Sequence, residues 1–202
     1  MIHLGMSGRL RVVPADTPHV KHDHVDFVLD SGKVLRFHDP RRFGSILWVG
    51  EDAANSKLLK NLGPEPFDET LTAVALYRVS RGRKTSIKQF IMDGRVIVGV
   101  GNIYASEALF RAKIRPGRAA GRVTLSRFGQ LLDAIRQVLS EAIKAGGTTL
   151  RDYSRVTGEP GYFEQSLDVY ERAGQPCVNC ATVIRRKVIG QRASYYCPRC
   201  QI

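Results

Sequence analysis

The sequence contains no long apolar run, comparatively few acidic residues and no cysteine before position 177. No segment approaches the roughly 18–20 consecutive apolar residues that a membrane-spanning helix needs. The first residues do not place a basic stretch before an apolar core, so they do not form a secretory signal peptide. Internal repeats and low-complexity tracts are also absent from the sequence. We therefore expect a cytoplasmic protein without a membrane partner.

Positive charge is abundant and unevenly distributed. The 202 residues include 31 Lys and Arg against 19 Asp and Glu, a net charge of +12. Residues 78–127 hold two acidic residues, Asp93 and Glu107, against twelve cations. Clustered cations release counterions from a phosphate backbone, so the pattern indicates a polyanionic partner. A merely solvated basic surface is the alternative. An anionic membrane surface is less favoured, because no long basic amphipathic helix is present.

Alternating apolar residues predict about four β-strands in the N-terminal part of the chain. The first is Gly8–Val13 and the second covers residues 25–29. A turn at residues 30–32 leads to a third strand near residues 34–37, and residues 46–49 form a fourth. Because four strands are too few for an independent β-sandwich, we expect the helices that follow to form a separate body.

Helical periodicity begins after Ser56. Asp68 is predicted to cap a helix that ends near Val79, and a short helix covers about residues 86–92. Asn102 is predicted to cap another helix that ends near Ala112. The longest helix covers about residues 126–145. Its predicted buried residues are Leu131, Leu132, Ile135, Val138, Leu139, Ala142 and Ile143.

All four cysteines lie near the C-terminus, in two C-x-x-C pairs separated by sixteen residues. Cys177, Cys180, Cys197 and Cys200 can close a tetrahedral site around one structural Zn²⁺ ion. Two disulfides and a thioredoxin-like redox pair are the alternatives. A cytosolic context disfavours the disulfides, and a redox pair needs one such motif before a helix. The residues between the pairs predict a β-hairpin that presents Arg185, Arg186, Lys187 and Arg192.

Two further stretches indicate contact with a phosphate backbone. Gly99 and Gly101 precede Asn102 at a predicted helix N-terminus, where free N–H groups favour an anion. In "DPRRFG", residues 39–44, two arginines precede a phenylalanine that could enter a base stack. An ordinary turn with Phe43 in the core is the alternative for the second stretch.

The chain resembles the formamidopyrimidine-DNA glycosylases, bacterial enzymes that excise oxidised purines such as 8-oxoguanine. The resemblance rests on ordered segments along the whole chain, which are "IHLGMSG", "KHDHVDF", "DPRRFG", "LGPEP", "VGVGNIYASE", "GGTTLRDY", "GEPGYF", "VYERAGQPC" and "QRASYYCPRC". It implies an α+β fold with three parts. These are the remainder of a β-sandwich catalytic domain (residues 1–54), a helix–two-turn–helix DNA-binding domain (55–165) and a Cys₄ zinc finger (166–202).

The resemblance also implies a role for particular residues on double-stranded DNA that contains oxidised purines or abasic sites. Matched by position, Met6, Arg41 and Phe43 fill the gap that an everted nucleotide leaves. DNA-binding positions match His22, Arg41 and Arg83. Phosphates around the lesion are gripped by His3, Asn102 and Arg192. The loop 148–163 corresponds to the one that closes over the extruded base. We expect the protein to act as a monomer in the bacterial cytoplasm, associated with the nucleoid.

The family's nucleophile is the amine of an N-terminal proline in a Pro-Glu-Leu-Pro-Glu opening, and the 202 residues contain no such segment. Residues 2–4 instead resemble the end of a strand whose beginning is missing. We therefore expect that these 202 residues are impaired in the glycosylase and AP-lyase reactions of the family. The family assigns Arg192 as proton donor in the second elimination. A guanidinium releases protons reluctantly, which favours a role in holding and neutralising the departing phosphate.

Two other functions stay open from the sequence. The first is a non-enzymatic zinc-containing module that binds damaged or abasic DNA. The second is a zinc-ribbon RNA-binding or structural protein, which the charge and the cysteines would permit but which the ordered resemblance disfavours.

Overall fold

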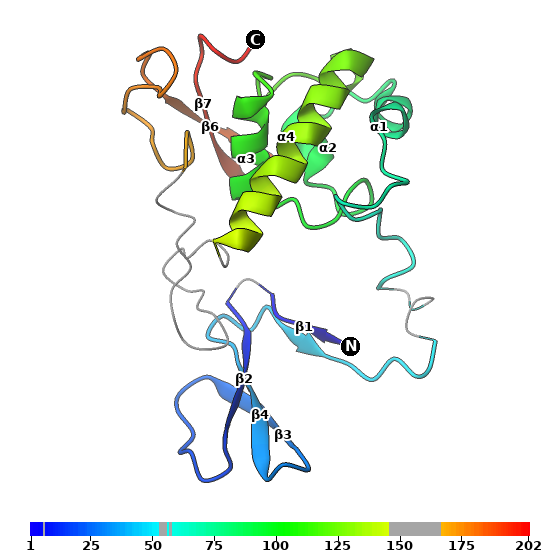
Figure 1. The fold of residues 1–202 in the computed structure, drawn as a ribbon, viewed down its shortest axis with the longest axis vertical. Coiled ribbons are helices and arrows are strands. Elements are labelled where there is room, and N and C mark those ends of the chain that lie inside the picture. The colour runs from blue at the N-terminus through cyan, green and yellow to red at the C-terminus, as the bar shows by residue number, and fades with distance from the viewer. Residues whose placement is uncertain (6, 53–55, 57, 146–166) are drawn as a thin grey trace. The chain divides into compact units, whose positions relative to one another are not determined.

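The computed structural model describes residues 1–5, 7–52, 56, 58–145 and 167–202. The chain divides into two compact units (Figure 1). The first comprises Met1–Ser56 with Ala142–Gln165, and the second comprises Lys57–Glu141 with Ser166–Ile202. Within the described ranges, no helix is long and apolar enough to cross a membrane.

The first unit contains two small antiparallel sheets. Strands β2 (Arg9–Pro14), β4 (Lys33–His38) and β3 (Asp23–Val28) form one sheet with β4 in the middle. The other sheet pairs β1 (Ile2–His3) with β5 (Ser45–Ile46). The strands predicted at residues 8–13, 25–29 and 34–37 are confirmed within one or two residues. The fourth is shorter than predicted.

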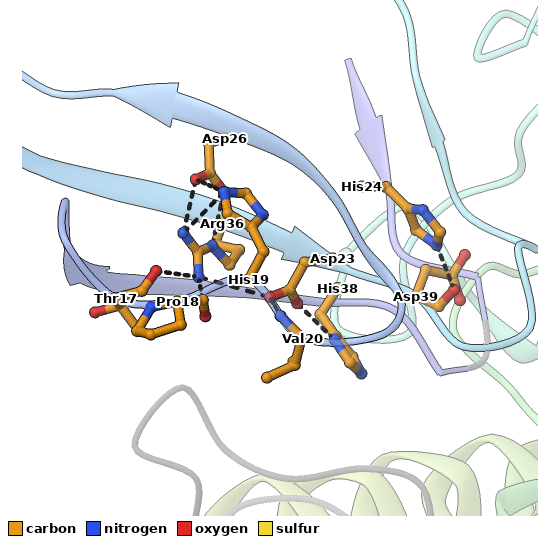
Figure 2. A network of polar contacts seen from close by, with 10 residues as sticks. All are labelled: Thr17, Pro18, His19, Val20, Asp23, His24, Asp26, Arg36, His38 and Asp39. Carbon is orange, nitrogen blue, oxygen red and sulfur yellow. Dashed lines mark hydrogen bonds and ion pairs between the residues drawn. The ribbon is translucent and has the colours of Figure 1, made fainter.

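A buried polar network holds the loop before β3 against the three-stranded sheet (Figure 2). The Arg36 side chain is 2 % exposed and donates two hydrogen bonds of 2.8 Å to the Asp26 carboxylate. A further nitrogen of Arg36 donates to the carbonyl oxygens of Thr17 and Pro18. The Arg36 guanidinium lowers the pKa of Asp26. Because a buried charge needs partners, this network fixes the path of residues 17–26.

The second unit packs its helices around an apolar core. Phe90 and Phe128 meet edge to face with ring centroids 5.9 Å apart, and Leu109, Leu131 and Ile135 are almost fully buried around them. The helices are α1 (Ala73–Ser80), α2 (Ile87–Ile91), α3 (Asn102–Arg111) and α4 (Leu125–Lys144), with a short 3₁₀ turn η1 (Ala120–Arg122) before α4. The four predicted helices are therefore present.

Three details of the helix predictions are wrong. Thr72, not Asp68, caps α1, because its hydroxyl accepts the Ala75 N–H, while Asp68 accepts from Thr70 in the preceding turn. Asn102 is the first residue of α3 and Gly101 is its N-cap, without a side-chain cap. Ile143 in the last turn of α4 is 68 % exposed, because the buried face of the helix ends with its neighbour Ala142.

The predicted C-terminal hairpin is formed by β6 (Arg185–Ile189) and β7 (Arg192–Tyr196), which lies beside α3 (Figure 1). Phe110 from α3 joins Val169, Ile184 and two cysteines in one buried cluster. The hairpin therefore shares its core with the helices.

A buried lysine also ties the hairpin to α2. The Lys88 side chain is buried, and its ammonium group donates to the Ala193 carbonyl oxygen at 2.8 Å and to the Ser194 hydroxyl at 2.7 Å. Burial, with a smaller contribution from the positive charge of Arg192, lowers the pKa of Lys88 to about 8. Lys88 thus joins two segments more than a hundred residues apart, although burial partly disfavours its charged form.

We predict a pH-dependent stability from Lys88. Below pH 8 the lysine is protonated in both the folded and the unfolded chain, so the full cost of burying its charge is present. Between the folded pKa of about 8 and the unfolded value of 10.5, the folded protein releases the proton and gains stability as the pH rises. Relative to Lys88→Met, the wild-type free energy of unfolding should rise by up to about 3 kcal/mol over that range.

Urea unfolding followed by circular dichroism in the presence of zinc measures this difference. Lys60→Met is the control, because Lys60 is exposed. A constant difference between wild type and Lys88→Met from neutral pH to pH 10.5 would contradict the prediction.

Candidate nucleic-acid interface and zinc centre

The four cysteines come together at the base of the hairpin. Their Sγ atoms all lie within 4.8 Å of one another. The Cys180 and Cys200 sulfurs are 3.4 Å apart, Cys180 and Cys197 3.5 Å, and Cys177 and Cys200 3.9 Å. A tetrahedral zinc ion with Zn–S bonds of about 2.3 Å requires sulfurs about 3.8 Å apart. The four thiolates therefore fit one structural zinc ion, with no position left for a substrate.

The four thiols differ in their proton affinity. The Thr182 hydroxyl lowers the pKa of Cys180 to about 6, whereas burial and hydrogen bonds from the other thiols raise that of Cys200 to about 12. Four thiolates this close repel one another unless a cation neutralises them, and zinc deprotonates the thiols that it binds. Disulfide bonding is not observed, because all four cysteines are free.

Glu107 connects the zinc hairpin to α3. Its carboxylate is completely buried and accepts the backbone N–H groups of Asp168, Val169 and Tyr170 at 2.8–3.0 Å. Burial raises the pKa of Glu107, although the three N–H groups oppose that shift. The carboxylate thus fixes the start of the segment that leads into the zinc centre.

The hairpin presents Arg192 at the first position of β7, where its side chain is exposed. Its cross-strand partner is Ile189, and Gly190 and Gln191 between them both have positive φ angles. Gly190 packs against α2, since a Cβ there would lie 2.5 Å from the Gln89 side-chain nitrogen. Arg192 therefore follows a tight turn that packs against α2.

Asn102 lies at the start of α3, where the first N–H groups of the helix lack intrahelical partners. Its side-chain nitrogen lies 3.4 Å from the Tyr170 hydroxyl, while its side-chain oxygen is buried and has no hydrogen-bond partner among the described residues. Turning the amide over exchanges the two atoms but still leaves one of them without a partner. Asn102 is thus held by Tyr170 with unused hydrogen-bonding capacity at a helix N-terminus.

Arg83 lies before α2 and is exposed. Its guanidinium lies 5.4 Å from the centroid of the Phe90 ring. In the second unit the structure therefore presents Arg83, Asn102 and Arg192 from three separate segments of one folded body.

In the first unit, Asp39 organises the "DPRRFG" loop. The carboxylate is 1 % exposed and accepts hydrogen bonds from the Ser7 hydroxyl at 3.0 Å and the Gly44 N–H at 2.7 Å. Burial opposes ionisation, but these bonds and the N–H groups of Arg41 and Arg42 hold the pKa of Asp39 below its usual value. One carboxylate therefore closes the loop and ties it to Ser7.

The main chain of Asp39 also forms hydrogen bonds to a third segment, residues 22–24. Its N–H donates to the His22 carbonyl oxygen at 3.0 Å. Its own carbonyl oxygen accepts from His24 at 2.9 Å (Figure 2). Three segments that carry predicted DNA-binding residues thus meet at one residue.

The loop leaves its arginine and phenylalanine exposed. Phe43 is 62 % exposed, so it is not a core residue, and the Arg41 guanidinium lies 5.6 Å from its ring centroid. Gly44 permits close packing behind them, because a Cβ there would lie 2.8 Å from the His3 carbonyl oxygen. His3 is exposed, and its ring accepts the Gly5 N–H at 3.1 Å. Met6 lies outside the described residues, as does the loop 148–163.

His22 adopts a φ angle of +80° and stacks edge to face on His38, with ring centroids 6.1 Å apart. Partial burial lowers the pKa of His22, and the nearby charge of Lys21 adds to that shift. A neutral ring can donate one hydrogen bond and accept another.

Three buried residues that no sequence pattern singled out hold the candidate segments, one in the first unit and two in the second. Asp39, Lys88 and Glu107 are buried charged groups that bond to backbone or side-chain atoms distant in the chain. A signal existed for Asp39, because Asp before a proline and a glycine favours a turn. A carboxylate inside the apolar segment of α3 gave a weaker signal for Glu107.

Zinc removal is expected to unfold the hairpin. Structural zinc supplies of the order of 10 kcal/mol of folding free energy in zinc-finger peptides. Chelation should therefore greatly accelerate amide hydrogen exchange in β6 and β7, whereas β2, β3 and β4 in the other unit should retain their protection. Hairpin amides that stay protected after chelation would show that zinc does not hold this element.

Substitution Asp39→Ala is expected to loosen the loop 39–44. It leaves the Ser7 hydroxyl and the Gly44 N–H without an acceptor, at about 1–3 kcal/mol for each buried group. Amide exchange at Gly44 should become faster. Asp39→Asn keeps one acceptor oxygen and should give an intermediate rate, and the exposed Asp16→Ala is the matched control. Equal rates in all four proteins would rule out this role for Asp39.

Comparison with known proteins gives matches along nearly the whole chain. Residues 1–46 match the formamidopyrimidine-DNA glycosylase N-terminal domain. Residues 62–154 match the formamidopyrimidine-DNA glycosylase H2TH domain, and residues 174–202 match the zinc finger found in FPG and IleRS.

Relatives at high identity agree with these domains. The formamidopyrimidine-DNA glycosylases of Syntrophotalea carbinolica and Alcanivorax borkumensis are 60 % and 59 % identical, and each comparison covers all of this chain and 74 % of the relative. The crystal structure of the Thermus thermophilus MutM (Fpg) protein has a TM-score of 0.89 at 40 % identity, over 99 % of this chain and 74 % of the other. A Lactococcus lactis Fpg bound to abasic-site DNA has a TM-score of 0.90 at 32 % identity, over 99 % and 73 %. The chain therefore belongs to the formamidopyrimidine-DNA glycosylase family, whose members are base-excision repair DNA glycosylases.

Proposed function

We propose that these 202 residues recognise double-stranded DNA at an oxidised purine or an abasic site and grip the phosphates around it. The observation that carries the proposal is the loop 39–44, where an exposed phenylalanine and arginine stand on a rigid base. An aromatic ring on such a loop can fill the space that an everted nucleotide leaves, while the arginine bonds to the orphaned base. Structures of Lactococcus lactis Fpg with Fapy-dG DNA and with abasic-site DNA support this choice of lesion.

We assign the remaining contacts residue by residue. Arg41 and Phe43, with Met6, fill the gap. His22 and Arg83 contact DNA outside the gap. His3, Asn102 and Arg192 bind phosphates near the lesion, and Arg192 neutralises the departing phosphate during strand cleavage. We propose that the protein acts as a monomer in the bacterial cytoplasm. Its binding to DNA would associate it with the nucleoid.

Catalysis by these residues alone is a separate question. The resemblance implies that the family's nucleophile is the amine of an N-terminal proline, which has no counterpart in the sequence. The Met1 amino group donates to the Leu47 carbonyl oxygen at 2.7 Å, and this bond does not favour it as a substitute nucleophile. We therefore propose that the 202 residues bind damaged DNA without forming a covalent adduct. A non-enzymatic binding module is the alternative description of the same behaviour.

Binding and trapping experiments test these two statements separately. Fluorescence anisotropy should show that a duplex with a central abasic-site analogue binds at least about tenfold more tightly than the undamaged duplex, or ~1.4 kcal/mol. Arg192→Gln should weaken abasic-site binding by about 10–100-fold, since it removes a charged contact. Arg186→Gln is the matched control, because Arg186 is exposed on the opposite face of the same hairpin.

Borohydride reduction with a natural abasic site should trap no adduct. Equal affinity for damaged and undamaged duplexes would overturn the proposed recognition. A trapped adduct would leave recognition intact and overturn the statement about catalysis.

A further inference from the structure

A groove with a volume of about 370 Å³ lies in the second unit, between residues 115–118 and the zinc hairpin. Three exposed cations, Arg115, Arg118 and Lys187, line it together with Ile189 and Tyr196. None of the assigned DNA-binding residues lines this groove. We refer to the surface formed by these five residues as the basic groove.

Backbone hydrogen bonds fix the wall of the basic groove that residues 115–118 form. The Arg118 carbonyl oxygen accepts the Ile87 N–H at 2.6 Å, and the Pro116 carbonyl oxygen accepts the Lys88 N–H at 3.2 Å. Both bonds anchor the segment on the first turn of α2. The backbone of this wall is therefore fixed in the folded unit.

The hairpin wall approaches the same segment closely. A Cβ at Gly117 would lie 3.8 Å from the Ile189 side chain, and the Arg115 guanidinium lies 5.5 Å from the centroid of the buried Tyr196 ring. The stacked Arg115 is consequently oriented by an aromatic face.

No acidic side chain neutralises the cations of the basic groove within the part of the chain that the structure describes. The ion pairs there involve Arg36, Arg95, Arg111 and two histidines, and none involves Arg115, Arg118 or Lys187. Ile202, the last residue of the sequence, also lines the groove, so its terminal carboxylate offsets part of this positive charge. The net positive charge that remains in a concave surface attracts an anion.

The register of the hairpin relates this charge to Arg192. Lys187 pairs with Ser194, and Ile189 pairs with Arg192. Residues directly opposite each other, and residues two apart on one strand, lie on the same face of a hairpin. Lys187 therefore shares a face with Arg192, about 7 Å further along the strand direction. Arg192 and Lys187 thus extend the positive charge of the groove along one face of the hairpin, which suits an extended polyanion better than a single small anion.

We infer that the basic groove binds the sugar-phosphate backbone of duplex DNA on one side of the lesion. This inference depends on the proposed contact of Arg192 with a phosphate near the lesion, because continuity with that contact distinguishes a DNA strand from an acidic protein segment. Phosphate contacts of this kind add affinity without sequence preference.

The salt dependence of binding tests the inference. Each phosphate contact contributes about 0.9 to the slope of log affinity against log salt concentration, so R118Q/K187Q should reduce the slope by about 1.8. Arg115 is left in place because it packs on Tyr196. K33Q/K60Q removes the same charge at two other exposed lysines and is the matched control. Zinc content and thermal unfolding of each variant confirm that it folds.

Three abasic-site duplexes locate the contact. One has long flanks on both sides, and each of the others is shortened to a few base pairs on one side of the lesion. The reduced slope of R118Q/K187Q should appear with the first duplex and with one shortened duplex, and should vanish with the other. An unchanged slope, a reduction equal to that of K33Q/K60Q, or the same reduction with all three duplexes would overturn the inference and leave an acidic protein segment as the better candidate.

The undamaged long duplex separates this inference from the proposed function. If the wild-type protein does not prefer the abasic site but R118Q/K187Q still reduces the slope on undamaged DNA, the lesion recognition fails and the groove contact stands. If the wild-type protein has no salt-dependent affinity for either duplex, both fail.

Discussion

Segments that carry exposed cations and an exposed aromatic ring cannot bury much apolar surface of their own, and buried charged side chains hold such segments in this protein. Asp39 accepts hydrogen bonds from the loop 39–44 and from Ser7. Glu107 accepts three consecutive N–H groups at the start of the zinc segment. Lys88 donates to Ala193 and Ser194, the two residues of β7 that follow Arg192. In each case a desolvated charge is stabilised by several backbone or hydroxyl groups, so the segments are held in one geometry.

This arrangement explains which parts of the structure the sequence could predict. The zinc site follows from spacing, because two C-x-x-C pairs around a hairpin have few other uses. The core helices follow from their periodicity, and Leu131, Ile135 and Val138 are buried as predicted. Both signals are local or repeat along the chain, so they can be recognised without the fold.

The errors arise where two local choices compete. Asp68 and Thr72 are both good caps, and the chain uses Thr72 because Asp68 is engaged by Thr70. Asn102 follows a glycine that caps α3 through its backbone, so its side chain is left to meet Tyr170. The roles of Asp39, Glu107 and Lys88 depend on partners 5 to 106 residues away, which no periodicity reveals. The division into three domains and the roles of the individual site residues stay predictions.

The zinc hairpin concentrates positive charge more than its own structure requires. Arg192 lies near enough to Lys88 to contribute to the lowered pKa of that lysine, and Lys187 lies on the same face as Arg192. Such repulsion destabilises the free protein and is relieved when a polyanion binds, so DNA binding and hairpin stability are thermodynamically linked. A phosphate at Arg192 would also favour the protonated form of Lys88 and thereby strengthen the bond between α2 and β7. The closed Cys₄ site performs no chemistry itself, but it keeps this charged hairpin folded in the absence of a polyanion that would compensate the charge.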